Sequence, residues 1–230
     1  MALKGLDIFK LSPKKNCKEC GSPTCMAFSM KVAQGSVAID KCPYMSDEAK
    51  RLVSEATAPP MATVTVGAGD AQYKLGGETV LYRHEKTFVS KNLFGVQLNC
   101  PHCIENKLPE LELVDYERIG ERMHTEVLSL HFGGNTEKYL ELIEKAMGKG
   151  FALILDCRDE AAAREALSLC AAEKPILNGA AADNYETMTA LAKEFDLVLG
   201  VRGESLDAIF DTTAAIEALG YKKLVLDVTG

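Results

Sequence analysis

Residues 125–157, TEVLSLHFGGNTEKYLELIEKAMGKGFALILDC, contain the pattern that decides the fold. A short apolar run at 125–132 is followed by a stretch at 136–147 in which apolar residues recur every three or four positions, and then by a second apolar run at 152–157. Short apolar runs indicate strands, and the 3.6-residue period indicates a helix. Strand, helix and strand in this order predict two parallel strands joined by a helix that covers their sheet.

The same alternation continues along the chain on both sides of this stretch. Strands are predicted at 88–98, 125–132, 152–157, 176–180, 197–202 and 224–229. Helices are predicted at 136–147, 159–172, 183–195 and 204–219, with the first crossover poorly defined. Because no strand carries a nucleotide-binding fingerprint, these α/β units favour the first three-quarters of a (β/α)8 TIM-type barrel over a doubly wound sheet. A barrel cut after its sixth strand leaves open edges, so we expect a fragment of a longer protein.

Four cysteines near the start of the chain, Cys17, Cys20, Cys25 and Cys42, follow the spacing C-x2-C-x4-C-x16-C-P. The first three thiols come from one tight turn and the fourth returns from beyond a predicted helix, which suits a cubane iron-sulfur cluster. Four thiolates also suit a structural zinc site, but such sites usually pair two C-x2-C knuckles. We predict a 4Fe-4S cluster with these four ligands, and zinc or four unligated buried thiols remain alternatives.

The residues after the third cysteine favour an anionic group. Residues 24–34, TCMAFSMKVAQ, predict a helix with Met26, Met30 and Ala33 on its apolar face. Its N-terminus would point at the cluster, where free N–H groups and the helix dipole favour negative charge. Residues 1–57 carry nine Lys and Arg against six Asp and Glu, a net charge of +3. Because the whole chain has a net charge of −7, the remaining residues carry −10. A solvated lysine surface explains the same excess without a cluster.

Composition and residue patterning indicate the domain organisation and argue against some functional classes of protein. The expected domains are a cluster domain at 1–57, a linker and β-hairpin segment at 58–86 with a stiff Ala58-Pro59-Pro60, and the partial barrel at 87–230. A net charge of −7 argues against nucleic acid as a partner. No apolar run reaches the length of a membrane span, and eight cysteines without an export signal lead us to expect a cytoplasmic protein.

A second cysteine pair, Cys100-Pro-His-Cys103, has no clear place in this organisation. It could be a redox-active disulfide, since a helix N-terminus and His102 would lower a thiol pKa, or an adventitious metal site. An ordinary loop with two thiols is favoured, because a thioredoxin-like unit would need its own fold. Cys157 and Cys170 are interpreted as small buried apolar residues.

The remaining ionisable residues give weaker indications. His84, His124 and His131 show no metal-ligand spacing and are interpreted as packing or surface residues. Asp156 and Asp227 end predicted strands, where a barrel places active sites. Capping of the following loop is their expected role, and no acid/base pair is predicted.

Several segments taken together carry a family resemblance: LDIFKLSPKKNCKECGSPTCMAF at 6–28, DKCPYMS at 40–46, APPMATVTVGAG at 58–69, ETVLYRHEKTF at 78–88 and NYETMTALAKEF at 184–195. They resemble the large (gamma) subunit of the corrinoid iron-sulfur protein, part of the acetyl-CoA decarbonylase/synthase system. The cysteine spacing alone also resembles ferredoxin-like subunits of membrane electron-transport complexes. Joined to the YRHEKTF segment at 82–88 and the predicted barrel, the cysteine motif becomes highly specific.

The resemblance implies a methyl carrier of the reductive acetyl-CoA pathway rather than an independent catalyst. In the family, a cobamide takes a methyl group from methyl-tetrahydrofolate or a related pterin through a methyltransferase and passes it to acetyl-CoA synthase. The 4Fe-4S cluster supplies the electron that returns Co(II) to Co(I), and its ligands here match Cys17, Cys20, Cys25 and Cys42. The family binds the corrinoid on a C-terminal domain beyond the barrel, so we expect none bound by this chain alone.

The implied partners are a small subunit in a heterodimer, the methyltransferase, acetyl-CoA synthase and a reductive activator or ferredoxin. Two other functions remain open. A stand-alone 4Fe-4S electron-transfer protein would need only the first 57 residues, and a pterin-binding barrel methyltransferase would be distinguished by a pterin-binding test.

Overall fold

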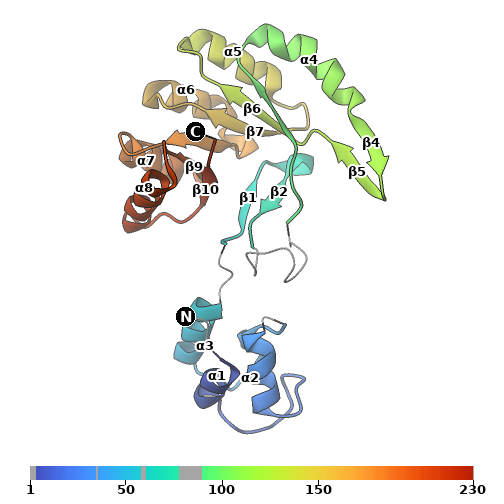
Figure 1. Ribbon diagram of the computed structural model, residues 1–230, viewed down its shortest axis with the longest axis vertical. Helices are drawn as coiled ribbons and strands as arrows, with labels where there is room; N and C mark the ends of the chain where they lie inside the picture. Colours follow the sequence, from blue (N-terminus) through green and yellow to red (C-terminus); the bar gives the residue numbers. More distant parts are fainter. Residues whose placement is uncertain (1–3, 35, 58–60, 78–89, 230) are drawn as a thin grey trace. The chain divides into compact units, whose positions relative to one another are not determined.

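The structure, a computed structural model, describes residues 4–34, 36–57, 61–77 and 90–229. The chain divides into two compact units, Met1–Pro60 and Met61–Gly230 (Figure 1). The predicted linker Ala58-Pro59-Pro60 and His84 lie outside the described residues. None of the described helices has both the length and the apolar character that crossing a membrane requires.

The smaller unit is helical in its described part. Its elements are α1 (Gly5–Leu11), α2 (Cys25–Ala33), the 3-10 turn η1 (Ile39–Lys41) and α3 (Asp47–Thr57). The predicted helix after the third cysteine is confirmed, but its predicted apolar face is wrong, since Met30 is 49 % exposed. The buried residues of α2 are Cys25, Phe28, Ser29 and Val32. This stripe lies one position away from the predicted one, and its Phe28 and Val32 pack into a core with Ile8 of α1.

The larger unit contains one sheet of six parallel strands. They are β3 (Gly95–Leu98), β6 (Val127–His131), β7 (Ala152–Asp156), β8 (Ile176–Ala180), β9 (Val198–Arg202) and β10 (Leu224–Asp227). All six predicted strands are confirmed, although β3 begins at Gly95 rather than at 88, and residues 88 and 89 are not described.

The strand order is β10-β9-β8-β7-β6-β3, so each strand lies beside its neighbour in the chain. A doubly wound sheet reverses its order at the middle, and this sheet does not. Within the described residues, β3 and β10 are the two edges of the sheet. The predicted TIM-type barrel therefore remains a prediction, whereas the α/β class with a parallel sheet is confirmed.

Five helices cover one face of this sheet (Figure 1). They are α4 (Pro101–Leu113), α5 (Thr136–Ala146), α6 (Glu160–Cys170), α7 (Tyr185–Phe195) and α8 (Leu206–Ala218). The four predicted helices are confirmed, and α4 occupies the crossover that the sequence did not define. Fully buried leucines of the strands, such as Leu128, Leu155 and Leu177, pack against these helices and form the main core.

The opposite face of the sheet meets a short hairpin of β1 (Val64–Val66) and β2 (Tyr73–Leu75). Val64 and Val66 form an apolar cluster with Ile176 and Val198 of the sheet. The described part of the predicted hairpin segment is thus confirmed. A second hairpin, β4 (Asp115–Arg118) and β5 (Glu121–His124), was not predicted. Its turn, Ile119-Gly120, has positive φ at both positions, as a tight hairpin turn requires.

Candidate functional site

The four predicted ligand cysteines all lie in the smaller unit. Cys17 and Cys20 belong to the loop between α1 and α2, Cys25 is the first residue of α2, and Cys42 follows η1. Cys25 and Cys42 are buried, Cys20 is half-buried and Cys17 is exposed. The loop is turned tightly by residues with positive φ, which are Lys14, Asn16, Lys18 and Gly21.

Hydrogen bonds hold the third cysteine at the start of its helix. The backbone N–H of Asn16 donates to Cys25 Sγ at 3.4 Å, and the N–H of Cys25 donates to Asn16 Oδ1 at 2.8 Å. The Thr24 hydroxyl accepts from the Ala27 N–H at 3.1 Å and caps the helix. An N–H donor to sulfur and a helix N-terminus both place positive partial charge beside Cys25 Sγ, which suits an anionic group at this position.

Two contacts join the loop of the first three cysteines to the segment that carries the fourth. The Tyr44 hydroxyl donates to Glu19 Oε1 at 2.9 Å, and the Lys15 ammonium lies 3.9 Å from the centre of the Tyr44 ring. The hydrogen bond to Glu19 raises the pKa of Tyr44. Glu19 adjoins Cys20, and Tyr44 is two residues after Cys42. The structure therefore brings the two ligand-bearing segments together.

The donor set fits an iron-sulfur cluster in its chemistry, since four thiols lie on loops and helix starts of one small unit. Within the described part of the chain, no three His, Cys, Asp or Glu side chains are placed so that they could hold one metal ion. A cubane holds its four thiolates farther apart than a single ion does. The assignment of these ligands therefore stays a prediction.

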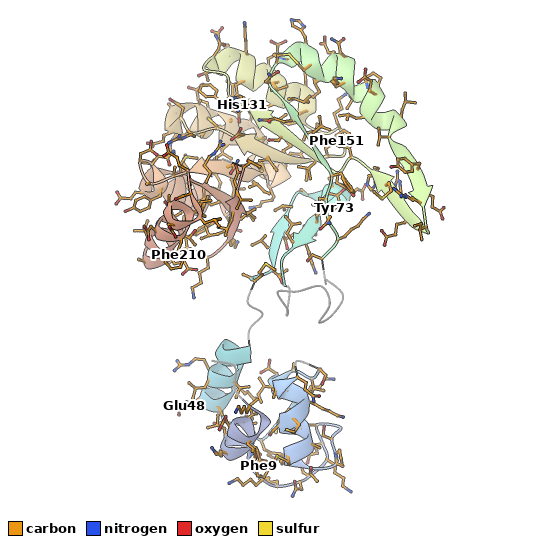
Figure 2. All side chains as sticks on the ribbon, in the orientation of Figure 1. Phe9, Glu48, Tyr73, His131, Phe151 and Phe210 are labelled. Carbon is orange, nitrogen blue, oxygen red and sulfur yellow. A yellow bond between two sulfur atoms is a disulfide. The ribbon has the colours of Figure 1, made fainter. Side chains whose placement is uncertain are left out.

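A second group of polar side chains lies at the carboxyl ends of the parallel strands, where Asp156 ends β7. His131, labelled in Figure 2, ends β6, and its Nδ1 lies 2.7 Å from Asp156 Oδ2. Arg202 Nη1 and Gln97 Nε2 each donate to the same carboxylate at 3.4 Å. Asp156 is 8 % exposed, and this carboxylate is the centre of the group.

Asn178 connects this centre to Asp227, because its Nδ2 lies 2.9 Å from Asp227 Oδ2 and 3.4 Å from Asp156 Oδ1. We call Gln97, His131, Asp156, Asn178, Arg202 and Asp227 the strand-end cluster. Most of these residues line a cavity of about 310 Å³. Burial raises the pKa of Asp227, but hydrogen bonds from Thr229 and Asn178 and the charge of Arg202 outweigh it and lower the pKa overall.

The strand-end cluster was missed by the sequence analysis, although sheet register could have revealed it. Asp156 pairs in register with His131 on one side and with Asn178 on the other. Asp227 pairs with Arg202. The predicted capping role is confirmed for Asp227, whose Oδ1 accepts from the Thr229 N–H at 3.1 Å. Asp156 does not take this role, because its carboxylate accepts hydrogen bonds from Arg202 and Gln97.

Glycine makes room for the cluster. A Cβ on Gly200 would overlap Asn178 Oδ1, so only glycine lets this amide reach both carboxylates. Gly179 has a φ of 126°, and the pairing of β8 with β9 shifts register between Asn178 and Ala180. The irregularity therefore falls directly after the amide that joins the cluster.

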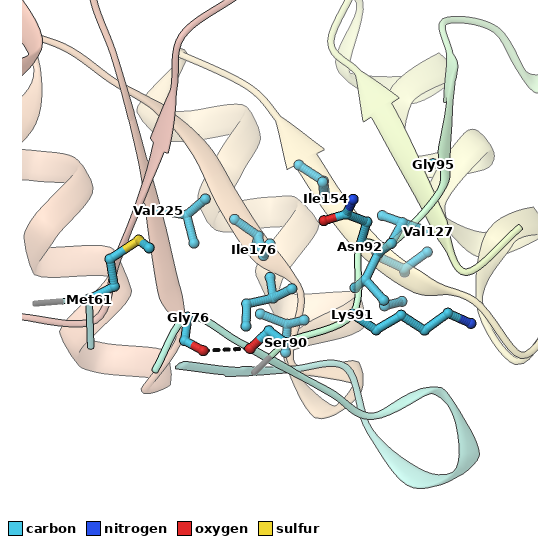
Figure 3. Close-up of a pocket in the computed structure, with 15 residues that line it drawn as sticks. Met61, Gly76, Ser90, Lys91, Asn92, Gly95, Val127, Ile154, Ile176 and Val225 are labelled. Carbon is cyan, nitrogen blue, oxygen red and sulfur yellow. Dashed lines mark hydrogen bonds between the residues drawn. The ribbon is translucent and has the colours of Figure 1, made fainter. Parts of the chain in front are cut away.

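A larger cavity of about 580 Å³ lies along the same face of the sheet (Figure 3). Ile154, Ile176 and Val225 line both cavities, and Val66 and Leu75 of the β1–β2 hairpin line only the larger one. This face is therefore mainly apolar at the hairpin and polar at the carboxyl ends of the strands.

The other cysteines divide into two kinds. Burial raises the pKa of Cys157 to about 11 and that of Cys170 to about 12, so both stay protonated and confirm the predicted packing role. Cys100 and Cys103 are joined by a disulfide at the start of α4. The predicted ordinary loop with two separate thiols is wrong, because the residues after Cys100 begin a helix.

Comparison with known proteins agrees with the division of the chain into two units. Residues 13–44 match a family described as "Putative Fe-S cluster", and residues 63–230 match one described as "CO dehydrogenase/acetyl-CoA synthase delta subunit". The chain is 37 % identical over 232 residues to the corrinoid/iron-sulfur protein large subunit of Moorella thermoacetica, covering 99 % of this chain and 52 % of that protein.

It is also 30 % identical over 233 residues to the acetyl-CoA decarbonylase/synthase complex subunit gamma of Methanothermobacter thermautotrophicus, covering 99 % of this chain and 51 % of that protein. The chain thus spans about half the length of these curated relatives. One family description names a delta subunit, but the large and gamma subunits match along both units, including the cysteine segment. The chain therefore belongs to the family of corrinoid iron-sulfur protein large subunits, the gamma subunits of acetyl-CoA decarbonylase/synthase.

Proposed function

We propose that this chain is part of the methyl-carrier subunit of a corrinoid iron-sulfur protein in the reductive acetyl-CoA pathway. The observation that carries the proposal is the similarity to the Moorella large subunit, which extends over 99 % of the chain and includes all four ligand cysteines of the smaller unit. Neither unit is left outside this similarity, whereas a stand-alone electron carrier would account only for the smaller unit.

The smaller unit is proposed to hold a 4Fe-4S cluster on Cys17, Cys20, Cys25 and Cys42. Such a cluster carries one electron at a time, and its proposed role is the reactivation of the corrinoid from Co(II) to Co(I). The residues of the chain would place positive partial charge beside the cluster, through the Asn16 N–H at Cys25 and the positive end of α2. The net charge of +3 on residues 1–57 offsets the negative charge of the cluster.

The larger unit is proposed to be six strands of a (β/α)8 barrel, supported by a parallel strand order that follows the chain without reversal. We place the cobamide in the half of the relatives that this chain does not span, and no residue of this chain is assigned to it. The proposed partners are the small subunit, a methyl-tetrahydrofolate or pterin methyltransferase, acetyl-CoA synthase and a reductive activator or ferredoxin.

The test is the metal content of the anaerobically purified chain. We expect a brown protein with about four iron and four acid-labile sulfide per chain. Cys42→Ser removes a ligand and is expected to lower the iron content by more than half. Cys170→Ser, which changes an equally buried thiol in the larger unit, is the matched control and should leave the iron content unchanged. Stoichiometric zinc without sulfide in the parent chain would refute the cluster.

A second candidate function has one observation in its favour. The strand-end cluster presents hydrogen-bond donors and acceptors around a cavity at the carboxyl ends of parallel strands, where barrels bind their ligands. A barrel methyltransferase that binds the pterin itself would use such a site. Calorimetric titration with methyl-tetrahydrofolate separates the two functions, because the methyl carrier is expected to show no binding and the methyltransferase a one-to-one complex.

A further inference from the structure

The disulfide of the larger unit lies at the junction of the edge strand β3 and helix α4. Cys100 precedes α4 as its N-cap residue, Pro101 is the first helical residue, and Cys103 completes the first turn. The Cα atoms of the two cysteines are 5.3 Å apart, within the usual range of disulfides. Both cysteines are half-buried, so solvent and a second molecule can reach them.

The two sulfurs have different surroundings. Cys100 Sγ accepts the backbone N–H of Cys103 at 3.1 Å, in the way that an N-cap oxygen does. The N–H groups at the start of the helix and the helix dipole favour negative charge at this position. Cys103 packs partly against the main core. When the disulfide is open, Cys100 Sγ therefore lies beside an N–H donor and the positive end of a helix, a setting in which cysteines are reactive.

From this arrangement we propose that Cys100 and Cys103 form a reversible dithiol/disulfide centre in which Cys100 is the exchanging sulfur. Its reaction partner is a dithiol. A thiolate of the dithiol attacks Cys100 Sγ, the bond to Cys103 breaks, and Cys103 leaves as a thiolate that takes up a proton.

The second thiolate of the dithiol then attacks the mixed disulfide and releases Cys100. The dithiol loses two electrons and two protons and becomes a disulfide, and the cysteine pair gains both. This centre is independent of the iron-binding cysteines, which lie in the other unit.

The remaining cysteines of the larger unit cannot take this role. Cys157 is 1 % exposed and Cys170 is not exposed, and their burial keeps both as protonated thiols. Exchange with a dithiol in solution needs access and a thiolate, and only the pair at α4 offers both.

The experiment equilibrates the full chain anaerobically with mixtures of reduced and oxidised dithiothreitol. The samples are quenched in acid, labelled with a maleimide in denaturant and digested with trypsin. Cleavage after Lys91 and Lys107 gives a peptide of residues 92–107 that contains this cysteine pair and no other cysteine. We expect the peptide to carry either no label or two labels, with a reversible two-electron transition between them.

Single-thiol variants test which sulfur exchanges. In Cys103→Ser, the remaining Cys100 is expected to react with glutathione disulfide, forming a mixed disulfide and releasing one glutathione, at least tenfold faster than the remaining Cys103 of Cys100→Ser. The parent titration needs neither variant and therefore stands even if one of them misfolds. Two labels in every mixture, no label in any mixture unless the chain is unfolded during equilibration, or a faster reaction at Cys103 would each overturn the proposal.

Discussion

The two units of this chain reach stability in different ways. The smaller unit has one thin core around Ile8, Phe28 and Val53, and two of its four predicted ligand cysteines, Cys25 and Cys42, are buried. The larger unit has a continuous core between a six-stranded sheet and five helices, and its strands contribute fully buried leucines. A domain of about 60 residues buries a smaller fraction of its surface than a larger domain does and is only marginally stable, so a metal centre can supply much of its stability. We therefore expect the smaller unit to depend on its predicted cluster and the larger unit on packing.

Removal of iron is expected to have the largest effect on the stability of the smaller unit. The absence of any effect would contradict the difference between the two units. Anaerobic chelation takes away the link between the loop and η1, so the smaller unit should lose its helices while the larger unit keeps its own melting transition. Circular dichroism measures the loss of helix and the melting transition, and limited proteolysis shows which unit is cut. A smaller unit that resists protease equally well with and without iron would show that its core suffices.

Truncation of a core leucine tests whether the stability of the larger unit depends on its packing. Leu177→Ala removes a fully buried side chain from β8 and is expected to lower the free energy of unfolding of the larger unit by about 2 to 5 kcal/mol. Leu206→Ala, at a leucine 73 % exposed, is the matched control, with an expected change within about 0.5 kcal/mol. Iron content should be unaffected in both, and its loss in Leu177→Ala would mean that the units are coupled.

A smaller effect is expected where the larger unit packs polar groups. Gly200→Ala places a methyl group against the Asn178 amide and is expected to destabilise the larger unit by about 1 to 3 kcal/mol. Gly133→Ala adds the same methyl group in open space and is the control. Urea unfolding measures both variants, and equal midpoints for the two would show that the strand-end cluster tolerates displacement of its amide.

The smallest expected effect concerns acid. Because the folded-state pKa of Asp227 lies below its usual value, its contribution to stability is present at neutral pH and is lost as the pH falls through that folded pKa. Asp227→Asn should therefore reduce the loss of stability of the larger unit as the pH falls below about 4. Exposed Asp211→Asn is the control, and identical acid profiles for both variants would contradict the role of Asp227.

The sequence predicted those features whose cause is local. Strand β7 was found because both of its faces are largely buried, so its apolar run from Ala152 to Leu155 is unbroken. Helix α4 was missed because Pro109 lies inside it, and the β4–β5 hairpin was missed because its residues are almost all exposed and do not alternate. The cysteine motif could be read from spacing, whereas the strand-end cluster takes its residues from six strands that only register brings together.

The order of the strands also bears on how the chain acquires its structure. From β6 to β10, each strand pairs with the one that precedes it by about 25 residues, so no pairing in this part of the sheet waits for a distant segment to be synthesised. Low separation between contacting residues speeds folding, and domains generally fold as they emerge from the ribosome. We expect the sheet to grow outward at one edge during translation. Ribosome-bound chains stalled after β8 should already show protected amides in β6 and β7.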